Sequence, residues 1–241
     1  MKAVILAAGY ATRLYPLTQD EPKHLLEVAG RPILDRLLGQ LPLEELDAVF
    51  VVTNAKFAGR FREWAAGAQV EVEVIDDGTT SEEDKVGAIG DLALAIREAG
   101  LDDDLVVAAG DSLFTERLDG LVRLAQERGA AAIAVYDVGD LEAIRRLSAI
   151  GVDPSDRVVS FEEKPESPSS TLAGIALYFF PRDVLPLVGE YLGEGNNPDQ
   201  PGRFVEWLYM RVPVYAWRVP GQWIDIGTPD ALAEAERAFS N

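Results

Sequence analysis

Short apolar runs alternate with amphipathic helical segments over the first 110 residues, and this alternation is the feature that most constrains the fold. The apolar runs are expected to be strands and the segments between them helices. Strands separated by helices at this spacing pair in parallel, as a doubly wound, mostly parallel, Rossmann-like α/β sheet. The expected strands are 3–8, 48–53, 70–75 and 104–109, and the expected helices are 32–41, 56–66 and 86–99.

The alternation loosens after residue 110. There the expected strands are 131–138, 158–162, 171–180 and 214–219, and the expected helices are 118–128, 140–147, 203–210 and 228–239. The last helix has a clear start, because Thr228 can cap it and Pro229 suits its first position. No repeat or linker interrupts the chain, so we expect one domain over residues 1–241. No long segment follows the last helix, so we expect no appended acyltransferase or β-helix domain.

Charge and composition exclude several classes of protein. The chain has 41 acidic and 22 basic residues and a net charge of −19, so we expect no nucleic acid as a partner. No apolar run approaches the roughly 18 residues of a membrane helix, and the first run is too short for a signal peptide. There are no cysteines for disulfides or thiolate metal sites. We therefore expect a cytoplasmic protein that does not bind a membrane; a homo-oligomer is compatible with the sequence.

A loop rich in small residues follows the first expected strand and suggests a phosphate site. Ala8, Gly9 and Ala11 allow a ligand to approach the backbone closely, and successive N–H groups in such a turn suit an anion. Arg13 adds a planar cation and Lys23 a point charge. The loop is neither a P-loop nor a dinucleotide loop, because Gly9 begins neither of those glycine patterns.

Three segments near the start share a spacing that is specific to one family. They are residues 6–14 (LAAGYATRL), Pro22-Lys23 and Gly30-Arg31-Pro32. Together they resemble the signature of the sugar-1-phosphate nucleotidyltransferases, and a weaker resemblance extends over nearly the whole chain. It implies a GT-A-like nucleotidyltransferase domain with a nucleotide-binding half up to about residue 110. Residues from about 111 to 241 would form a sugar-phosphate-binding half, with inserted strands over the sugar site.

The resemblance also implies a reaction. An NTP and a sugar 1-phosphate would be joined to give an NDP-sugar and pyrophosphate, with Mg²⁺ as cofactor. Arg13 would bind the β- and γ-phosphates, and Lys23 would stabilise the α-phosphate. The residues expected to contact the rest of the nucleotide are Leu6, Ala8, Gly9 and Gly87, of which Gly87 would read the base through its backbone.

Two aspartates are candidates for the metal site. Asp111 follows a buried strand, and ligands of open α/β sheets bind outside the carboxyl ends of strands. A hard cation such as Mg²⁺ prefers carboxylate oxygens. The resemblance implies that Asp111 takes part in catalysis and holds the metal, and that Asp225, in Trp223-Ile-Asp-Ile-Gly-Thr, completes the site.

The resemblance places the sugar phosphate in the second half. It implies that Glu163 binds sugar hydroxyls and that Lys164 binds the acceptor phosphate, within the segment Glu-Glu-Lys-Pro. It implies backbone contacts to the sugar from Gly151 and Gly174. The base and the sugar stay open, since residues 77–84 lack the glutamine of many uridylyl and thymidylyl members.

Two alternatives to this function remain. Relatives of the family transfer cytidylyl groups to phosphocholine or inositol phosphate, although Glu163, Lys164 and Gly151 favour a polyhydroxylated acceptor. A catalytically silent relative could only sense nucleotide-sugars, although Lys23 and both aspartates are present.

Two residues near the loop need separate interpretation. Ala11 stands where the family usually has its second glycine. A positive φ there would cost alanine on the order of 1 kcal/mol, so we expect a negative φ. His24 follows Lys23 directly, and we expect it to pack rather than to transfer protons, because a phosphate acceptor is already ionised at neutral pH.

Overall fold

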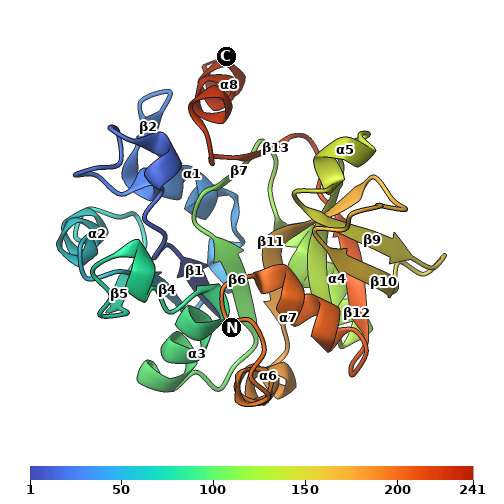
Figure 1. Ribbon diagram of the computed structural model, residues 1–241. Coiled ribbons are helices and arrows are strands. Elements are labelled where there is room, and N and C mark those ends of the chain that lie inside the picture. Colours follow the sequence, from blue (N-terminus) through green and yellow to red (C-terminus); the bar gives the residue numbers. More distant parts are fainter. Residues whose placement is uncertain (241) are drawn as a thin grey trace.

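The computed structural model describes residues 1–240 and places a nine-stranded mixed sheet at the centre of the protein (Figure 1). Its strands are β1 (Lys2–Leu6), β4 (Ala48–Thr53), β5 (Val72–Asp76), β6 (Leu105–Ala109), β8 (Ala131–Asp137), β9 (Ser148–Val152), β10 (Val158–Glu163), β11 (Leu172–Phe180) and β12 (Val214–Arg218). The helices are α1 (Ile33–Gln40), α2 (Ala58–Ala65), α3 (Ala88–Glu98), α4 (Asp119–Arg128), α5 (Leu141–Ile144), α6 (Leu185–Gly193), α7 (Pro201–Leu208) and α8 (Pro229–Phe239).

Four parallel strands from the start of the chain form one half of the sheet, in the order β5-β4-β1-β6. Alternate side chains of β1 enter two different cores. Ala3 and Ile5 pack with residues of α1, α2 and α4, whereas Val4 and Leu6 pack with residues of α3, α6 and α7. Helices therefore cover both faces, as parallel sheets require. The expected doubly wound α/β architecture is confirmed.

The sheet divides at β11, and this division makes room for a ligand. Leu177 and the residues after it pair antiparallel with β6, whereas Ala173 pairs with Ala149 of β9. Residues 174–176 lie between these two ladders, and the register with β8 on the other side shifts between Gly174 and Tyr178. The gap lies beside the carboxyl end of β6, where open α/β sheets bind their ligands.

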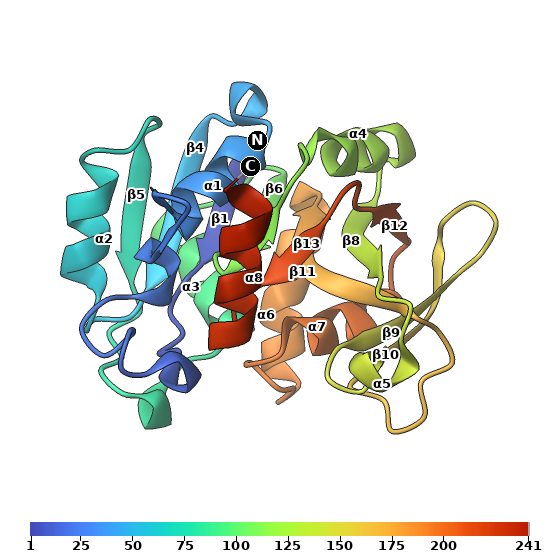
Figure 2. The same cartoon turned by 90° about the horizontal axis from the view of Figure 1, so that it is seen from above.

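A smaller layer covers that end of the sheet (Figure 2). It contains the ladders β2–β3 (Glu27–Val28 with Arg31–Pro32) and β7–β13 (Ser112–Phe114 with Trp223–Asp225). Helix α8 contacts β2 and β13. The Ala29 N–H, in the turn of the β2–β3 ladder, donates to Glu236 at 3.0 Å, and the guanidinium of Arg36 on α1 lies 4.8 Å from the Phe239 ring centroid. Thr228 caps α8 by accepting a hydrogen bond from Ala231 N–H at 3.2 Å, which confirms the expected start of that helix.

Three regions differ from the sequence expectation. The helix expected over 140–147 is limited to α5, and the chain then forms β9, which the sequence did not predict because Gly151 interrupts a short run. Helix α6 was also missed, since it contains Pro186 and Gly189, which lower helix propensity; the proline is tolerated because it lies in the first turn. Strands β7 and β13 have three residues each, too few to show a hydrophobic alternation in the sequence. No helix within residues 1–240 is long and apolar enough to cross a bilayer.

Candidate active site

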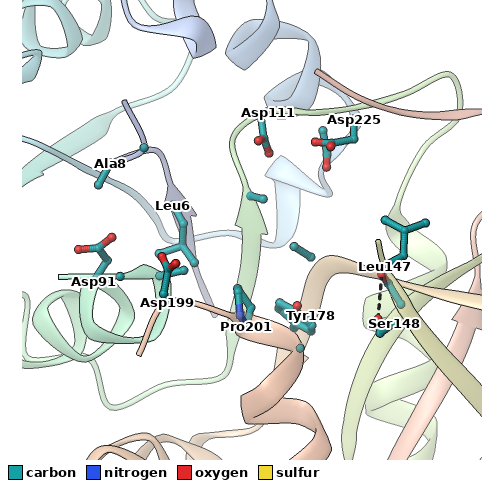
Figure 3. A pocket seen from close by; sticks show the side chains of 18 of the residues that line it. Leu6, Ala8, Asp91, Asp111, Leu147, Ser148, Tyr178, Asp199, Pro201 and Asp225 are labelled. Atoms are coloured by element: carbon teal, nitrogen blue, oxygen red, sulfur yellow. Dashed lines mark hydrogen bonds between the residues drawn. The ribbon is translucent and has the colours of Figure 1, made fainter. Parts of the chain in front are cut away.

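A cleft of about 360 Å³ opens at the gap beside β6. Its lining residues fall into three groups, which Figure 3 shows at separate sides of the cleft: Asp111 and Asp225, then Ala8, Asp91 and Asp199, then Leu147 and Ser148. We call Asp111 and Asp225 the carboxylate pair. We call Asp77, Glu82, Asp91 and Asp199 the acidic end. The carboxylate pair thus offers a site for cations at one side of the cleft. The acidic end forms a second side, and strands from the second half of the chain form a third.

The ladder β7–β13 brings the carboxylate pair together. Asp225 is the register partner of Ser112, the residue after Asp111, and Ile226 N–H donates to the Asp111 carbonyl at 3.0 Å. The Lys23 ammonium donates to the Asp111 carboxylate. Lys23 reaches it from a single 3₁₀ turn over residues 23–25, which follows Pro22. Residues separated by two hundred positions therefore meet at one corner of the cleft.

The two carboxylates have different protonation behaviour. Burial disfavours the charge on Asp111, but the adjacent Lys23 outweighs it and lowers the pKa of Asp111 below its usual range. Desolvation by the surrounding protein, and then the negative charge on Asp111, raise the pKa of Asp225 to about 6. The charges of Lys23 and Arg13 lower the pKa of Asp225 in part but do not cancel this rise. Two carboxylates at one corner of the cleft are oxygen donors of the kind that Mg²⁺ prefers, which fits the expectation of Mg²⁺.

Arg13 lies behind the carboxylate pair rather than on the cleft wall. A side chain at Gly227 would lie 3.2 Å from the Arg13 guanidinium and 3.3 Å from the Asp225 carboxylate, so both groups flank this glycine. The Arg13 side chain is exposed. Arg13 is thus close to Asp225 but does not line the cleft, and its contact to phosphates stays a prediction.

The expectation of a negative φ at Ala11 is wrong. Ala11 has a φ of +50° and starts the 3₁₀ turn over residues 12–14. Its carbonyl accepts hydrogen bonds from Leu14 N–H at 2.9 Å and from the Thr18 hydroxyl at 2.8 Å. These two bonds hold the left-handed conformation despite the methyl group. The loop therefore has the backbone that the glycine of the family would permit.

The residues expected to bind the nucleotide, Leu6, Ala8, Gly9 and Gly87, all line the cleft. Gly87 has a φ of +89°, and a Cβ there would lie 2.7 Å from the Pro198 carbonyl. That carbonyl accepts a hydrogen bond from Ile89 N–H at 2.7 Å, which holds the loop before α7 against the start of α3. Only glycine fits at position 87. This packing explains the residue without a ligand, so its contact to the base stays a prediction.

Glu163 and Gly174 line the opposite side of the cleft. Burial raises the pKa of Glu163, and its carboxylate occupies the space beside Gly202 that a side chain there would need. A Cβ on Gly174 would lie 2.7 Å from the Ser148 hydroxyl, so the position has no room for a side chain. The Ser148 hydroxyl donates to the Gly174 carbonyl at 3.5 Å. Glu163 thus places a carboxylate at this side of the cleft, and Gly174 places a backbone carbonyl there.

Gly151 and Lys164 do not line the cleft. Gly151 faces Ser160 of β10, whose side chain leaves no room for a Cβ, so packing of the β9–β10 hairpin accounts for this glycine. Lys164 is exposed, with a φ of +50°, and its N–H donates to the Leu147 carbonyl at 2.8 Å. Both residues thus lie outside the cleft wall, although Lys164 adjoins Glu163, and their contacts with the sugar phosphate stay predictions.

Arg146 lines the cleft beside Leu147 and Ser148, and no sequence motif pointed to it. It follows Arg145, whose guanidinium binds the Glu166 carbonyl and Glu142. Arg146 has no ion pair with any residue from 1 to 240. A cation that faces the cleft without a carboxylate partner can bind an anion. Two adjacent arginines in a sequence do not indicate which of their side chains faces the cleft.

His24 is buried beside Lys23, in agreement with packing. It is 2% exposed, its ring centroid lies 5.9 Å from that of Phe61, and Gly110 leaves space for its Cδ2. Burial and the Lys23 charge lower its pKa to about 3. Its imidazole is therefore neutral at physiological pH.

Known proteins resemble this chain over nearly its whole length. The nucleotidyl transferase family matches residues 2–241. The chain is 29% identical to a UTP–glucose-1-phosphate uridylyltransferase of Synechocystis, over 95% of this chain and 61% of that protein. It is 28% identical to a protein of Sulfolobus acidocaldarius named as a mannose-1-phosphate guanyltransferase, over 95% of this chain and 60% of that protein. The chain thus spans about 60% of the length of these relatives.

A solved structure has the same fold. It is described as a glucose-1-phosphate thymidylyltransferase from Bacillus anthracis in complex with a sucrose. The TM-score is 0.80 at 23% identity, and the match covers 100% of this chain and 96% of the other.

Proposed function

The chain belongs to the nucleotidyl transferase family, and on that premise we propose that it joins an NTP to a sugar 1-phosphate. A phosphate oxygen of the sugar 1-phosphate attacks the α-phosphorus of the NTP. The bond from that phosphorus to the bridging oxygen breaks, pyrophosphate leaves with the electron pair, and an NDP-sugar results. The observation that carries this proposal is one cleft that holds Lys23, two carboxylates and the Gly9 loop.

The cleft has separate sides, and this supports a separate place for each of the two substrates. Phosphates are attracted to the corner with Lys23, and the nucleoside then extends past Leu6 and Ala8 toward Gly87. The sugar occupies the side of Glu163 and Gly174, where a carboxylate and a carbonyl can accept hydrogen bonds from hydroxyls. Both substrates are anions, so their approach depends on positioning and charge neutralisation.

Lys23 has the central role in the proposed reaction. Its ammonium stabilises the negative charge that develops on the α-phosphate, and Asp111 holds that ammonium in place. No general base is needed, because the attacking phosphate is ionised, and the neutral, buried His24 agrees with this. Arg13 remains the candidate for contact with the β- and γ-phosphates.

The cofactor that fits the carboxylate pair is Mg²⁺. Asp111 and Asp225 would hold it, since two oxygen donors beside a single ammonium match a hard cation that keeps further positions for phosphate oxygens and water. When bound, the ion offsets negative charge on the triphosphate and on departing pyrophosphate.

One observation favours a second class of acceptor. Phe161, Tyr178 and Trp223 line the cleft together with Glu163. Aromatic rings together with a carboxylate are a combination that binds quaternary ammonium groups. Phosphocholine is therefore the second candidate acceptor.

The proposed function is tested by pyrophosphate release in the presence of Mg²⁺. The NTPs and dTTP are crossed with the 1-phosphates of glucose, mannose, galactose and N-acetylglucosamine, and with phosphocholine and inositol phosphate. We expect one sugar 1-phosphate to give a clear signal. Pyrophosphate release with phosphocholine or inositol phosphate alone would assign that compound as the acceptor in place of a sugar 1-phosphate. Nucleotide binding without pyrophosphate release for any pair would favour a regulatory relative.

Replacement of Lys23→Met tests its role. We expect turnover to fall by about 10² to 10³, the usual cost of losing one preorganised charge donor, while the far-ultraviolet circular dichroism spectrum stays the same. Lys56→Met is the matched control, because Lys56 is exposed and lies outside the cleft. Near-normal turnover in a folded Lys23→Met protein would contradict the assignment.

A further inference from the structure

Half of the buried polar side chains within residues 1–240 bind one short loop. Eight polar or charged residues are buried: Thr18, His24, Thr53, Asn54, Thr79, Asp91, Ser112 and Ser148. Four of these, including Asn54 and Thr79, form hydrogen bonds with the Gly9 loop, residues 7–11. A buried polar group costs free energy unless it is hydrogen-bonded. The four bonds fix the conformation of the loop around Gly9, which lies between the bonded residues.

Asn54 holds the loop at Ala8. It directly follows β4 and is 0% exposed, and its Nδ2 donates to the Ala8 carbonyl at 2.8 Å. Its Oδ1 accepts from Phe57 N–H at 3.1 Å, which fixes the orientation of the side-chain amide. Asn54 does not line the cleft. The Ala8 carbonyl is therefore directed into the interior of the protein.

The Ala8 carbonyl and the Gly9 N–H belong to one peptide group. That group is planar and trans, so its C=O and its N–H point in opposite directions. Because the carbonyl is directed to the buried Asn54, the N–H is directed away from the interior. Gly9 is exposed and lines the cleft, and no acceptor within residues 1–240 receives its N–H. The hydrogen bond from Asn54 thus leaves a backbone donor free at the cleft.

Tyr10 holds the loop on the other side of Gly9. Its side chain is 4% exposed, and its hydroxyl lies 3.1 Å from the Thr79 hydroxyl. The Thr79 hydroxyl donates its one proton to Asp77 Oδ1 at 2.8 Å, so Tyr10 is the donor to Thr79. Tyr10 is thereby bound to the turn that follows β5 (Val72–Asp76). Gly9 therefore lies between two residues that are held in the interior.

We infer that Asn54 and Tyr10 are positioning residues for nucleotide binding, an inference that rests on the proposed function. They hold the loop on both sides of Gly9, so its N–H has the direction that a phosphate oxygen requires before the NTP binds. A donor that needs no reorientation loses less freedom on binding. Neither Asn54 nor Tyr10 lines the cleft, so both act through Gly9 and not through contact with the substrate.

Two variants each remove one of these hydrogen bonds. Asn54→Ser keeps an oxygen that accepts from Phe57 N–H, as serine does at helix starts, but its shorter side chain does not reach the Ala8 carbonyl. Tyr10→Phe removes only the hydroxyl. Calorimetric titration with Mg²⁺ uses the NTP that the wild type binds most tightly. We expect the NTP affinity to fall about tenfold in Asn54→Ser and about threefold in Tyr10→Phe.

Asn196→Ser is the matched control. Asn196 also donates from its Nδ2 to a backbone carbonyl, that of Tyr191 at 2.9 Å, and it does not line the cleft. Its replacement should lower the free energy of unfolding and leave the NTP affinity unchanged. A merely structural role of Asn54 would give this same pattern in Asn54→Ser. Reduced stability with unchanged NTP affinity in the folded Asn54→Ser protein would therefore overturn the inference.

NMR spectroscopy follows the Gly9 N–H directly. In protein labelled with ¹⁵N-glycine, the Gly9 signal is identified by its absence in Gly9→Ala, where a Cβ would meet no other atom within 4 Å. Saturating NTP should shift this signal in the wild type and shift it less in Asn54→Ser. An equal shift in both proteins would contradict the positioning role. If Asn54→Ser does not fold, Tyr10→Phe replaces it in both measurements.

Failure of this inference and failure of the proposed function give different results. Equal NTP affinity in the wild type, Asn54→Ser and Tyr10→Phe overturns the positioning role and leaves nucleotidyl transfer intact. Weaker NTP binding in both variants, with no pyrophosphate release from the wild type for any acceptor, supports the positioning role and overturns the transfer reaction. Absence of NTP binding to the wild type overturns both.

Discussion

At the scale of single residues, backbone conformation and burial decide what a side chain does. Ala11 has a left-handed backbone because two hydrogen bonds to its carbonyl require it, and Asp91 holds a proton because its surroundings are buried and acidic. Neither property follows from residue type. Each leads to a measurable effect on stability.

Ala11→Gly should stabilise the protein. The left-handed conformation costs alanine about 1 kcal/mol more than glycine, and the loss of a half-buried methyl group offsets only part of this gain. Urea unfolding would show the increase in the free energy of unfolding. Ala95→Gly in α3 is the control, and it should lower stability because glycine destabilises a helix interior. A lower stability of Ala11→Gly would show that packing of the methyl group outweighs the strain.

Asp91 should make stability depend on pH. In the unfolded chain it ionises near pH 4, whereas in the folded protein its pKa is about 8. Between these values the folded state binds the extra proton, so the free energy of unfolding falls as pH rises from about 4 to about 8. Both Asp77 and Asp199 face Asp91 and strengthen the effect.

Asp91→Asn should therefore raise stability more at pH 8 than at pH 5, by an amount on the order of 1 kcal/mol or more. Urea unfolding at both pH values measures the difference. Glu71→Gln, an exposed position with the same change of charge, should show no such difference. An equal effect of Asp91→Asn at both pH values would mean that Asp91 is ionised in the folded protein.

At the scale of elements, the parts that repeat a pattern could be predicted and the parts that depend on distant pairing could not. The strands and helices before residue 110 follow hydrophobic periodicity, so their positions were found within a few residues. Strand β9 and the ladder β7–β13 are stabilised by partners elsewhere in the chain, and their own residues have no clear periodicity. The same reason explains the site. Motifs predicted Lys23, Asp111 and Asp225 as a group that the fold brings together, but only the fold reveals which of two adjacent arginines faces the cleft.

Arg146 gives a prediction at this scale, because the turn between α5 and β9 directs it inward. If it binds the acceptor phosphate, Arg146→Ala should raise KM for the sugar 1-phosphate about tenfold or more, as expected for a lost hydrogen bond to a charged group. Arg145→Ala is the matched control, since Arg145 binds Glu142 and the Glu166 carbonyl. Steady-state kinetics would compare the two, and equal effects on KM would argue against a role for Arg146.

At the scale of the whole molecule, the net charge of −19 opposes folding, and it would also oppose the binding of the anionic substrates proposed above. Raising the ionic strength from about 0.01 M to about 0.1 M shortens the Debye length from about 30 to about 10 Å. We expect Tm to rise with salt at pH 7. The rise should be smaller near the isoelectric point of about 4.4. Thermal unfolding measured at both pH values checks this, and a fall in Tm with salt would mean that surface ion pairs outweigh the repulsion.

The ladder β7–β13 also fixes the order in which the site becomes complete during synthesis. A ribosome adds residues from the N-terminus, so Lys23 and Asp111 emerge more than one hundred residues before Asp225. At about 5–20 residues per second this interval lasts several seconds. During that time the nascent chain has the ammonium and one carboxylate but not the second. The proposed reaction would therefore wait for β13, and a translation product that stops before this strand would lack the second carboxylate of the site.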